Sequence, residues 1–302
     1  MQKPATLISG YLGAGKTTLV NHLLRHAAGR RIAVAVNEFG ALPIDADLIE
    51  QACGEVLTLA GGCICCSFGD DLTSGLRALS ERNDIDCILI ETSGVALPGA
   101  VVRTLGLIAG LAHEATLVVL DAESARKRAR DKYLADTILR QLAEADLVVL
   151  NKTDLVDAQR RCDLRDWLAT TAPRAKIVET EFGALAPEIA FDAYMPSAFA
   201  ADAPASGHQG ARPQAEVFAL SGRTDVARLA AFLADDATGL VRAKGFLQDT
   251  GGAWRLLQVV GKRAAVTPAR APRENRASLV CIAHGAPFSR EAIAAFLREN
   301  ST

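Results

Sequence analysis

The chain has 302 residues, half of them hydrophobic and 23% charged, which suffices for one large and one small globular domain and excludes a disordered protein. The formal net charge of −2 gives no electrostatic reason to expect a nucleic acid or an anionic membrane surface as partner. The longest apolar stretch, residues 105–112, is far shorter than the roughly 20 residues that span a bilayer. Because residues 1–4 run directly into a strand-like segment, we expect no signal peptide and a cytoplasmic protein.

The first predicted strand, residues 6–8, is joined by a glycine-rich loop to a helix predicted over residues 16–27. Residues 10–17 fit the phosphate-binding loop pattern, in which backbone N–H groups converge on phosphate oxygens. Lys16 would contact the β- and γ-phosphates as a catalytic residue, and the Thr17 hydroxyl would bind Mg²⁺. The residues expected to hold the phosphates of the nucleotide are Gly10, Gly13, Ala14, Gly15, Lys16, Thr17 and Thr18.

A second buried strand is predicted over residues 32–36, and the residues Asn-Glu-Phe-Gly follow it at 37–40. The carboxylates of Glu38 and of Asp45, a little further along, would face the same phosphate edge of the sheet. Glu38 is therefore a candidate metal ligand and Asp45 a candidate catalytic residue. The alternative is that both carboxylates only cap their loop.

Three cysteines lie close together in the sequence Gly-Gly-Cys-Ile-Cys-Cys at residues 61–66. Thiolates suit Zn²⁺ and also Cu(I), so Cys63, Cys65 and Cys66 are candidate metal ligands. Neighbouring Cys65 and Cys66 would point apart in a regular strand, which leaves open whether two or three sulfurs bind at once. With no obvious fourth ligand, the site would be open and exchangeable, unlike a closed structural zinc site. Buried thiols or a redox pair are the alternative.

A helix predicted over residues 70–81 leads to a strand over residues 85–90 that ends in Glu-Thr-Ser-Gly. The carboxylate of Glu91 could hold Mg²⁺ through water or orient the attacking water, which makes Glu91 a candidate catalytic residue. Gly94 would let the backbone reach the γ-phosphate.

For the other histidine, cysteine and basic residues considered, we favour a structural role over a functional one. We favour an ordinary, hydrogen-bonded histidine at His113 over a further metal ligand. The basic run at residues 126–130 is interpreted as a solvated helix face, because the overall charge is near neutral. The remaining cysteines are expected to be buried and to pack like small hydrophobic residues. They are Cys53, Cys87, Cys162 and Cys281.

The motif Asn-Lys-Thr-Asp follows a strand predicted over residues 147–150. Asp154 could accept two hydrogen bonds from the N1–H and 2-amino groups of guanine, a donor pair that adenine lacks, so GTP is favoured over ATP. Asn151 and Lys152 belong to the same predicted nucleotide site. Residues 180–183 could form the loop that closes over the base.

The alternation of buried strands with helices predicts an α/β fold with a doubly wound, mostly parallel sheet over residues 1–195. Residues 196–214 are rich in Ala, Pro and Gly and are predicted to be an exposed linker. A smaller C-terminal α+β domain is predicted over residues 215–302. Its predicted strands are 216–220, 242–246, 254–260 and 278–282, and its predicted helices are 226–233 and 289–298.

The motifs together resemble the CobW-like family of P-loop GTPases, over residues 1–185 and, beyond the linker, at residues 242–246 and 256–261. The resemblance implies a GTP-dependent metallochaperone that holds its metal on the clustered cysteines. Ala41 and Pro43 depart from the acidic residue and glycine common in the family. The segments that carry the resemblance are GYLGAGKTT at 10–18, NEFG at 37–40, GCICC at 62–66, ETSG at 91–94 and NKTD at 151–154.

The leading hypothesis is a GTPase that couples its nucleotide state to binding of Zn²⁺, or in second place Co²⁺, and to its transfer to a client protein. No arginine finger is recognisable, so GTP turnover should be slow without a partner. One alternative is a regulatory GTPase with a structural or sensory zinc ion. Another is an ATP-dependent kinase or ligase. The client protein is not identified, and a homodimer is left open.

Overall fold

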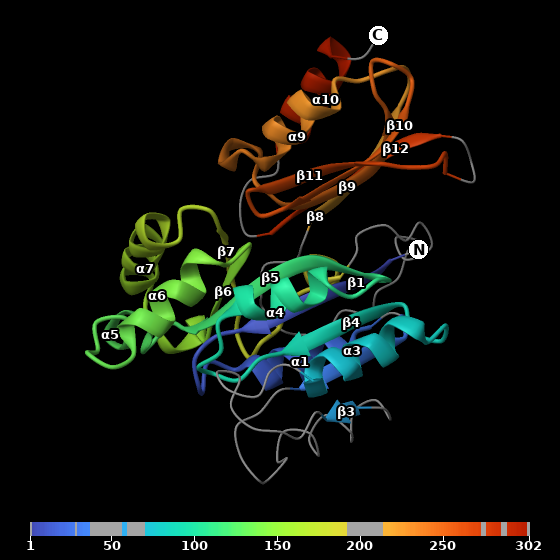
Figure 1. Cartoon of the computed structure of the whole chain (residues 1–302). Helices are drawn as coiled ribbons and strands as arrows, with labels where there is room; N and C mark the ends of the chain where they lie inside the picture. Colours follow the sequence, from blue (N-terminus) through green and yellow to red (C-terminus); the bar gives the residue numbers. More distant parts are fainter. Residues whose placement is uncertain are drawn as a thin grey trace. The chain divides into compact units, whose positions relative to one another are not determined.

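The computed structural model describes residues 2–27, 29–36, 56–58, 70–191, 214–272, 276–284 and 289–300. The chain divides into two compact units, Met1–Phe191 and Asp192–Thr302 (Figure 1). The predicted linker lies outside the described residues except for Gln214, which begins a strand. None of the helices in the described part of the chain has the length and apolarity that crossing a membrane would require.

Unit 1 contains a seven-stranded sheet in which every neighbouring pair of strands is parallel. The strand order, β3-β2-β4-β1-β5-β6-β7, places the first strand at the centre. Ligands of such sheets bind at the carboxyl ends of the strands, where the strand order reverses. The strands are β1 Lys3–Ser9, β2 Ile32–Val36, β3 Val56–Thr58, β4 Cys87–Glu91, β5 Leu111–Asp121, β6 Leu147–Asn151 and β7 Lys176–Glu179.

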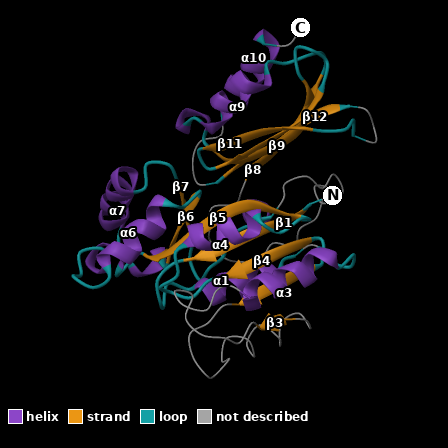
Figure 2. Ribbon diagram, viewed as in Figure 1, coloured by secondary structure: helices purple, strands orange, loops and turns teal. Residues whose placement is uncertain are grey.

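Helices cover both faces of this sheet (Figure 2). Leu7 of β1 belongs to a buried cluster with side chains of α3 and α4. Its neighbour Thr6 points to the other face, because side chains alternate along a strand, and there donates a hydrogen bond to the Ala190 carbonyl of α8. The helices are α1 Lys16–Arg25, α3 Asp70–Glu81, α4 Pro98–Gly106, α5 Ala125–Arg128, α6 Ala135–Ala143, α7 Ala158–Thr171 and α8 Pro187–Ala190, with a 3₁₀ turn η1 at Thr153–Leu155.

A second buried cluster joins α5, α6 and α7 to β5 and β6. Leu164 and Leu168 are the buried side chains of α7, and the half-buried Trp167 packs against the same cluster. This packing fixes α5 and α7 beside the carboxyl ends of β5 and β6.

Unit 2 contains an antiparallel five-stranded sheet in the order β11-β10-β9-β12-β8. Two helices, α9 Val226–Ala234 and α10 Arg290–Glu299, bury their apolar sides against it, and their Phe232 and Phe296 rings stack with centroids 4.3 Å apart. Trp254 begins β10. The strands are β8 Gln214–Leu220, β9 Leu240–Gln248, β10 Trp254–Val260, β11 Arg263–Pro268 and β12 Ala277–Ala283, and a 3₁₀ turn η2 lies at Asp236–Thr238.

The predicted fold class is confirmed, but several described elements and one cysteine were not predicted correctly. The strand β3, the helices α4 and α8, the edge strand β11 and the two 3₁₀ turns were missed. Residues 105–112, read as one apolar stretch, are divided between the end of α4 and the start of β5, with Gly110 at φ 89° between them. Cys87 and Cys281 are buried as expected, whereas Cys162 is exposed on α7, so its predicted burial was wrong. Cys53 lies outside the described residues.

Candidate nucleotide-binding site

The loop between β1 and α1 has a backbone that only glycine can adopt at two of its predicted positions. Gly10 has φ 132°, and an added Cβ would lie 2.2 Å from the Val119 carbonyl oxygen. Gly15 has φ 98°, and its added Cβ would lie 2.4 Å from Asn151 Nδ2. Side chains at either position would therefore push the loop away from β5 and β6. The loop therefore lies tightly against Val119 of β5 and Asn151 of β6.

A cavity of about 710 Å³ lies at this edge, within the size range of small-molecule sites. The structure thus brings together eight of the predicted site residues from three separate segments, which are Gly13, Gly15, Lys16, Thr17, Thr18, Glu91, Gly94 and Lys152. The remaining lining residues are Leu12, Thr92, Ser93 and Val95.

The floor of the cavity carries oxygen atoms suited to a hard divalent cation. Thr17 Oγ1 donates a hydrogen bond of 2.9 Å to Glu91 Oε1, and Glu91, the last residue of β4, is only 4% exposed. The buried hydroxyls of Thr92 and Ser93 have no hydrogen-bond partner among the described residues. A hydroxyl and a carboxylate at this distance, with further hydroxyls beside them, fit Mg²⁺ and its bound water better than a soft metal.

Asn151, at the end of β6, connects two loops through its side chain. Its Nδ2 donates to the Ala14 carbonyl at 3.0 Å, and its Oδ1 accepts hydrogen bonds from Gly183 N at 2.9 Å and Thr180 Oγ1 at 3.2 Å. Because all three partners are protein groups, the Asn151 side chain holds the phosphate-binding loop against residues 180–183.

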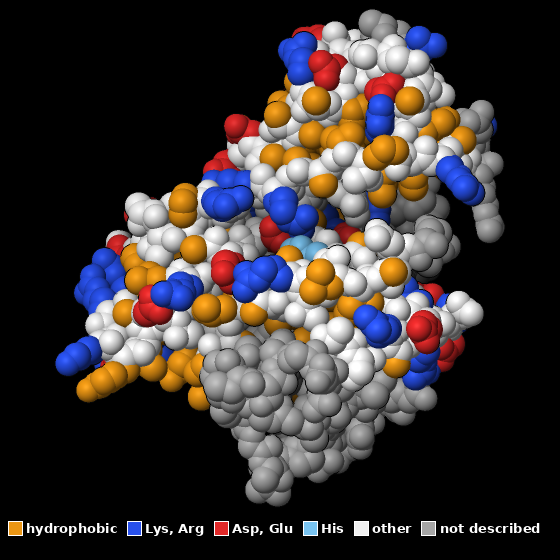
Figure 3. All heavy atoms as spheres, viewed as in Figure 1, with side chains coloured by type: hydrophobic (Ala, Val, Ile, Leu, Met, Phe, Trp, Pro, Cys, Tyr) orange, Lys and Arg blue, Asp and Glu red, His pale blue; other side chains and the backbone are white. Residues whose placement is uncertain are grey.

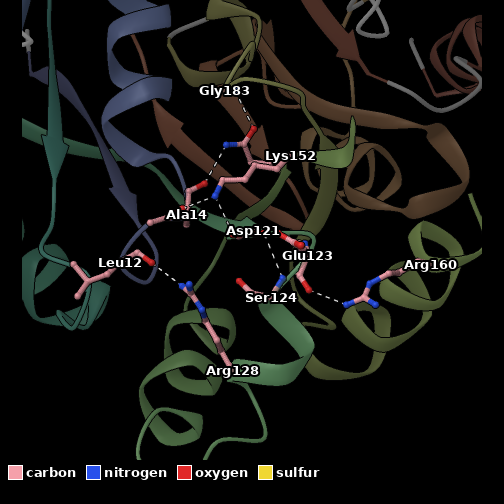
Figure 4. Close-up of polar contacts among 11 residues, drawn as sticks. Leu12, Ala14, Asp121, Glu123, Ser124, Arg128, Lys152, Arg160 and Gly183 are labelled. Carbon is pink, nitrogen blue, oxygen red and sulfur yellow. Dashed lines mark hydrogen bonds and ion pairs between the residues drawn. The ribbon is translucent and has the colours of Figure 1, made fainter. Parts of the chain in front are cut away.

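Lys152 spans the phosphate-binding loop and β5 (Figure 4). Its Nζ donates to the Gly13 carbonyl at 2.8 Å and to Asp121 Oδ2 at 2.9 Å. Burial alone would raise the pKa of Asp121, but the hydrogen bonds from Lys152 and Glu123 N and the charge of Lys152 outweigh it and lower that pKa. Asp121 was not predicted as a site residue. The sequence feature that could have identified Asp121 is its position directly after the apolar run 117–120. There it lies beside Asn151 at the carboxyl edge of the sheet.

Asp154 lies in η1 and is exposed, outside the lining of the cavity. The 3₁₀ turn is held beside residues 180–183 by Thr153, whose N and Oγ1 both donate to the Thr180 carbonyl. In that loop Phe182 is 63% exposed and has φ 53°, an uncommon conformation for a residue with a side chain. Contact of Asp154 and this loop with a base stays a prediction.

Gln141 of α6 was not predicted either, although it holds the segment after β4. Its side chain is fully buried, and Nε2 donates to the carbonyls of Gly94 and Ala96 at 3.2 and 2.9 Å. Gly94 in turn lies against the phosphate-binding loop, because an added Cβ would be 2.7 Å from Leu12 N. Gln141 therefore fixes Gly94 at the side of the cavity where the γ-phosphate is expected.

Of the residues weighed as ligands of the transition metal, only His113 lies in the described part of the chain. Ring nitrogen Nε2 of His113 lies 2.9 Å from Thr116 Oγ1, as an ordinary hydrogen-bonded histidine would. In the part of the chain that the structure describes, no three His, Cys, Asp or Glu side chains are grouped to hold a metal. Glu38, Asp45, Cys63, Cys65 and Cys66 lie outside that part.

Two family models match the chain. Residues 4–179 match the model described as "CobW/HypB/UreG, nucleotide-binding domain", and residues 214–300 match "Cobalamin synthesis protein cobW C-terminal domain". The zinc chaperone CobW of Pseudomonas aeruginosa is 39% identical over 215 residues, which cover 60% of this chain and 57% of that protein. The zinc-regulated GTPase metalloprotein activator 1 of Schizosaccharomyces pombe is 34% identical over 196 residues, 60% of this chain and 46% of that protein.

Among solved structures, Zn(II)-bound YjiA GTPase from E. coli aligns over 100% of both chains with 22% identity and a TM-score of 0.47. This chain spans about half of the length of each of the two relatives from Pseudomonas aeruginosa and Schizosaccharomyces pombe.

Proposed function

Because the chain belongs to the CobW/HypB/UreG family of nucleotide-binding proteins, we propose that it is a GTP-hydrolysing metallochaperone that transfers a transition metal to a client protein. The metal proposed first is Zn²⁺, with Co²⁺ second. The observation that carries the proposal is the cavity at the carboxyl edge of the sheet, where Lys16, the Thr17–Glu91 pair and Lys152 meet around a glycine-rich loop.

Each described side chain has a task in this proposal. Lys16 neutralises charge on the β- and γ-phosphates, while Thr17 and Glu91 would hold Mg²⁺. When bound, Mg²⁺ would neutralise the charge that develops on the phosphate oxygens. In the alternative role Glu91 would orient the attacking water, and Asp45, which lies outside the described residues, is the second proposed catalytic residue. Asp154 selects guanine.

The metal to be transferred is assigned to Cys63, Cys65 and Cys66, with Glu38 as a further ligand. In the sequence these residues stand between the segment that carries Thr17 and the segment that carries Glu91. The names of two relatives, a zinc chaperone and a zinc-regulated GTPase, support Zn²⁺ as this metal. If GTP changes the affinity for Zn²⁺, then Zn²⁺ must change the affinity for GTP by the same factor.

The test is the affinity for Zn²⁺, measured by competition with a chromogenic chelator in the presence of Mg²⁺ and either GDP or a non-hydrolysable GTP analogue. We expect the two affinities to differ by about tenfold, equivalent to ~1.4 kcal/mol of coupling. The difference should vanish when Cys63, Cys65 and Cys66 are replaced by Ala. The matched control is Cys162→Ala, which removes an exposed thiol outside the cluster. Equal affinities in both nucleotide states would contradict metal transfer and leave a regulatory GTPase.

A further inference from the structure

A surface hollow of unit 1, separate from the nucleotide cavity, is surrounded by basic side chains. It has a volume of about 360 Å³ and lies between α5 with the residues just after it and the first turns of α7. Basic side chains gather at this end of unit 1 in Figure 3, over the place of α5 in Figure 1. The lining residues are Arg126, Lys127, Arg130, Arg160, Asp163 and Leu164.

The charge of the hollow is strongly positive, since four cations face one carboxylate. The structure shows no ion pair for Arg126, Lys127 or Arg130 within the described ranges, and all three are exposed. Oδ1 of Asp163 already accepts a hydrogen bond from Gln159. The chain as a whole carries −2, so this concave site is opposite in sign to the molecule. A concave surface of one sign concentrates ligands of the other sign.

The shape and lining favour carboxylates on a peptide over other polyanions. Three of the four cations are arginines, whose planar guanidinium groups bind carboxylates through two parallel hydrogen bonds. No aromatic side chain lines the hollow, so single-stranded nucleic acid would find no surface for stacking. A flat membrane surface would not enter a concave site.

One hydrogen bond joins α5 to the phosphate-binding loop, and another joins α7 to the residues just before α5 (Figure 4). Arg128, next to Lys127, turns to the phosphate-binding loop, where Nη1 donates to the Leu12 carbonyl at 2.6 Å and the guanidinium lies 5.3 Å from the centre of the Tyr11 ring. Arg160 Nη2 donates to the Glu123 carbonyl at 2.7 Å. A ligand that moves α5 would therefore move the backbone of the phosphate-binding loop.

We propose that the hollow between α5 and α7 is a docking site for an acidic segment of a partner protein, and that docking is transmitted to the nucleotide through Arg128. The docking half stands on the charge and shape of the hollow alone. The transmission half rests on the proposed binding of guanine nucleotide.

Docking is tested without nucleotide, by fluorescence anisotropy of a labelled hexaglutamate peptide at low salt. The variant Arg126→Gln/Lys127→Gln/Arg130→Gln should bind at least about tenfold more weakly, because three charge pairs are lost together. The control variant Arg77→Gln/Arg103→Gln/Arg174→Gln removes the same charge at exposed positions of unit 1 and should keep the wild-type affinity within about twofold. Equal weakening in both variants, or tighter binding of an oligothymidylate of equal charge, would overturn the docking site.

Transmission is tested by the rate at which a fluorescent GDP analogue leaves the protein, with and without saturating peptide. We expect the peptide to change this rate by about threefold or more in the wild type, in line with usual coupling energies. In Arg128→Gln the peptide should still bind but leave the rate unchanged. If the rate does not respond in the wild type, or responds equally in the variant, Arg128 does not transmit docking. A protein that binds peptide but no GDP would contradict the proposed function and leave the docking site intact.

Discussion

The Lys152 ammonium group bridges a carbonyl oxygen of the phosphate-binding loop and the carboxylate of Asp121. Asp121 is only 7% exposed, so its charge depends on this contact. Replacing Lys152 by Met should destabilise the protein by about 1–3 kcal/mol, because a buried carboxylate loses its charged partner. Urea unfolding at neutral pH measures this change. The double variant Lys152→Met/Asp121→Asn should recover most of the loss, and a double variant as unstable as Lys152→Met would contradict the explanation.

The same pair predicts a dependence on pH. In the wild type the pKa of Asp121 is lowered, so its contribution to stability is present above its unfolded pKa and is lost as pH falls through its folded pKa. In Lys152→Met the ammonium group no longer offsets burial, so the pKa of Asp121 rises above its wild-type value and the carboxylate is protonated at higher pH. The stability difference between wild type and variant should therefore shrink as unfolding is measured from pH 7 toward pH 4. A difference independent of pH would mean that Asp121 is not its source.

Asp154 carries the expected preference for guanine. Its substitution by Ala should reduce the ratio of GTP to ATP affinity by about 10-fold or more, since a site that no longer pairs the donors of the base loses discrimination. Competition of both nucleotides against a fluorescent GDP analogue gives this ratio. Asp166→Ala, an exposed aspartate on the neighbouring α7, serves as the matched control. An unchanged ratio in Asp154→Ala would remove the basis for choosing GTP.

Which site residues could be predicted depends on what each side chain contacts. Lys16, Thr17, Glu91 and Lys152 belong to motifs whose spacing and place after a strand predict a shared edge, and the structure brings them together. Gln141 and Arg128 hold backbone carbonyls of distant loops. No sequence pattern marks that contact, and the arginine could only be read as part of a solvated basic run.

At the scale of elements, α6 positions the segment that follows β4 through Gln141. Replacing Gln141 by Met keeps the approximate size but removes both donated hydrogen bonds, so the Gly94 segment should loosen. Because this segment lies where the γ-phosphate is expected, affinity for a GTP analogue should fall about threefold more than affinity for GDP. Calorimetric titration of both nucleotides measures the difference. Gln159→Met on the exposed side of α7 is the control, and equal losses for both nucleotides would contradict a γ-phosphate-specific role.

The predicted elements were accurate where burial left a clear pattern. Strand β10 matches its predicted bounds because five of its seven residues are apolar and its second half contains the buried Leu257, Val259 and Val260. Edge strand β11 was missed because Arg263–Pro268 is half-exposed or exposed along its length, and a strand without a buried face has no alternation to recognise. Helix α4 was missed because its apolar sequence continues into β5, and composition alone does not separate a buried helix from a buried strand.

At the scale of the whole molecule, the resemblance to one family is confirmed in both units, by separate models. The two units also have separate buried clusters. All lining residues of the nucleotide cavity belong to unit 1. Residues 1–191 expressed alone should therefore bind GDP within about threefold of the full-length affinity. Residues 214–302 are the control and should fold without binding GDP. Loss of GDP binding by residues 1–191 would show that the site needs unit 2.

The whole chain contains two tryptophans, and the structure assigns one to each unit: Trp167 on α7 and Trp254 at the start of β10. Since Trp167 is packed against the cluster that supports α5, its emission should respond to events near the phosphate-binding loop. With Trp254 replaced by Phe, the intrinsic fluorescence of the chain becomes an optical signal from unit 1 alone, and the reciprocal variant reports unit 2. The molecule thus contains its own pair of spectroscopic probes, through which the melting of each unit can be followed in the intact protein.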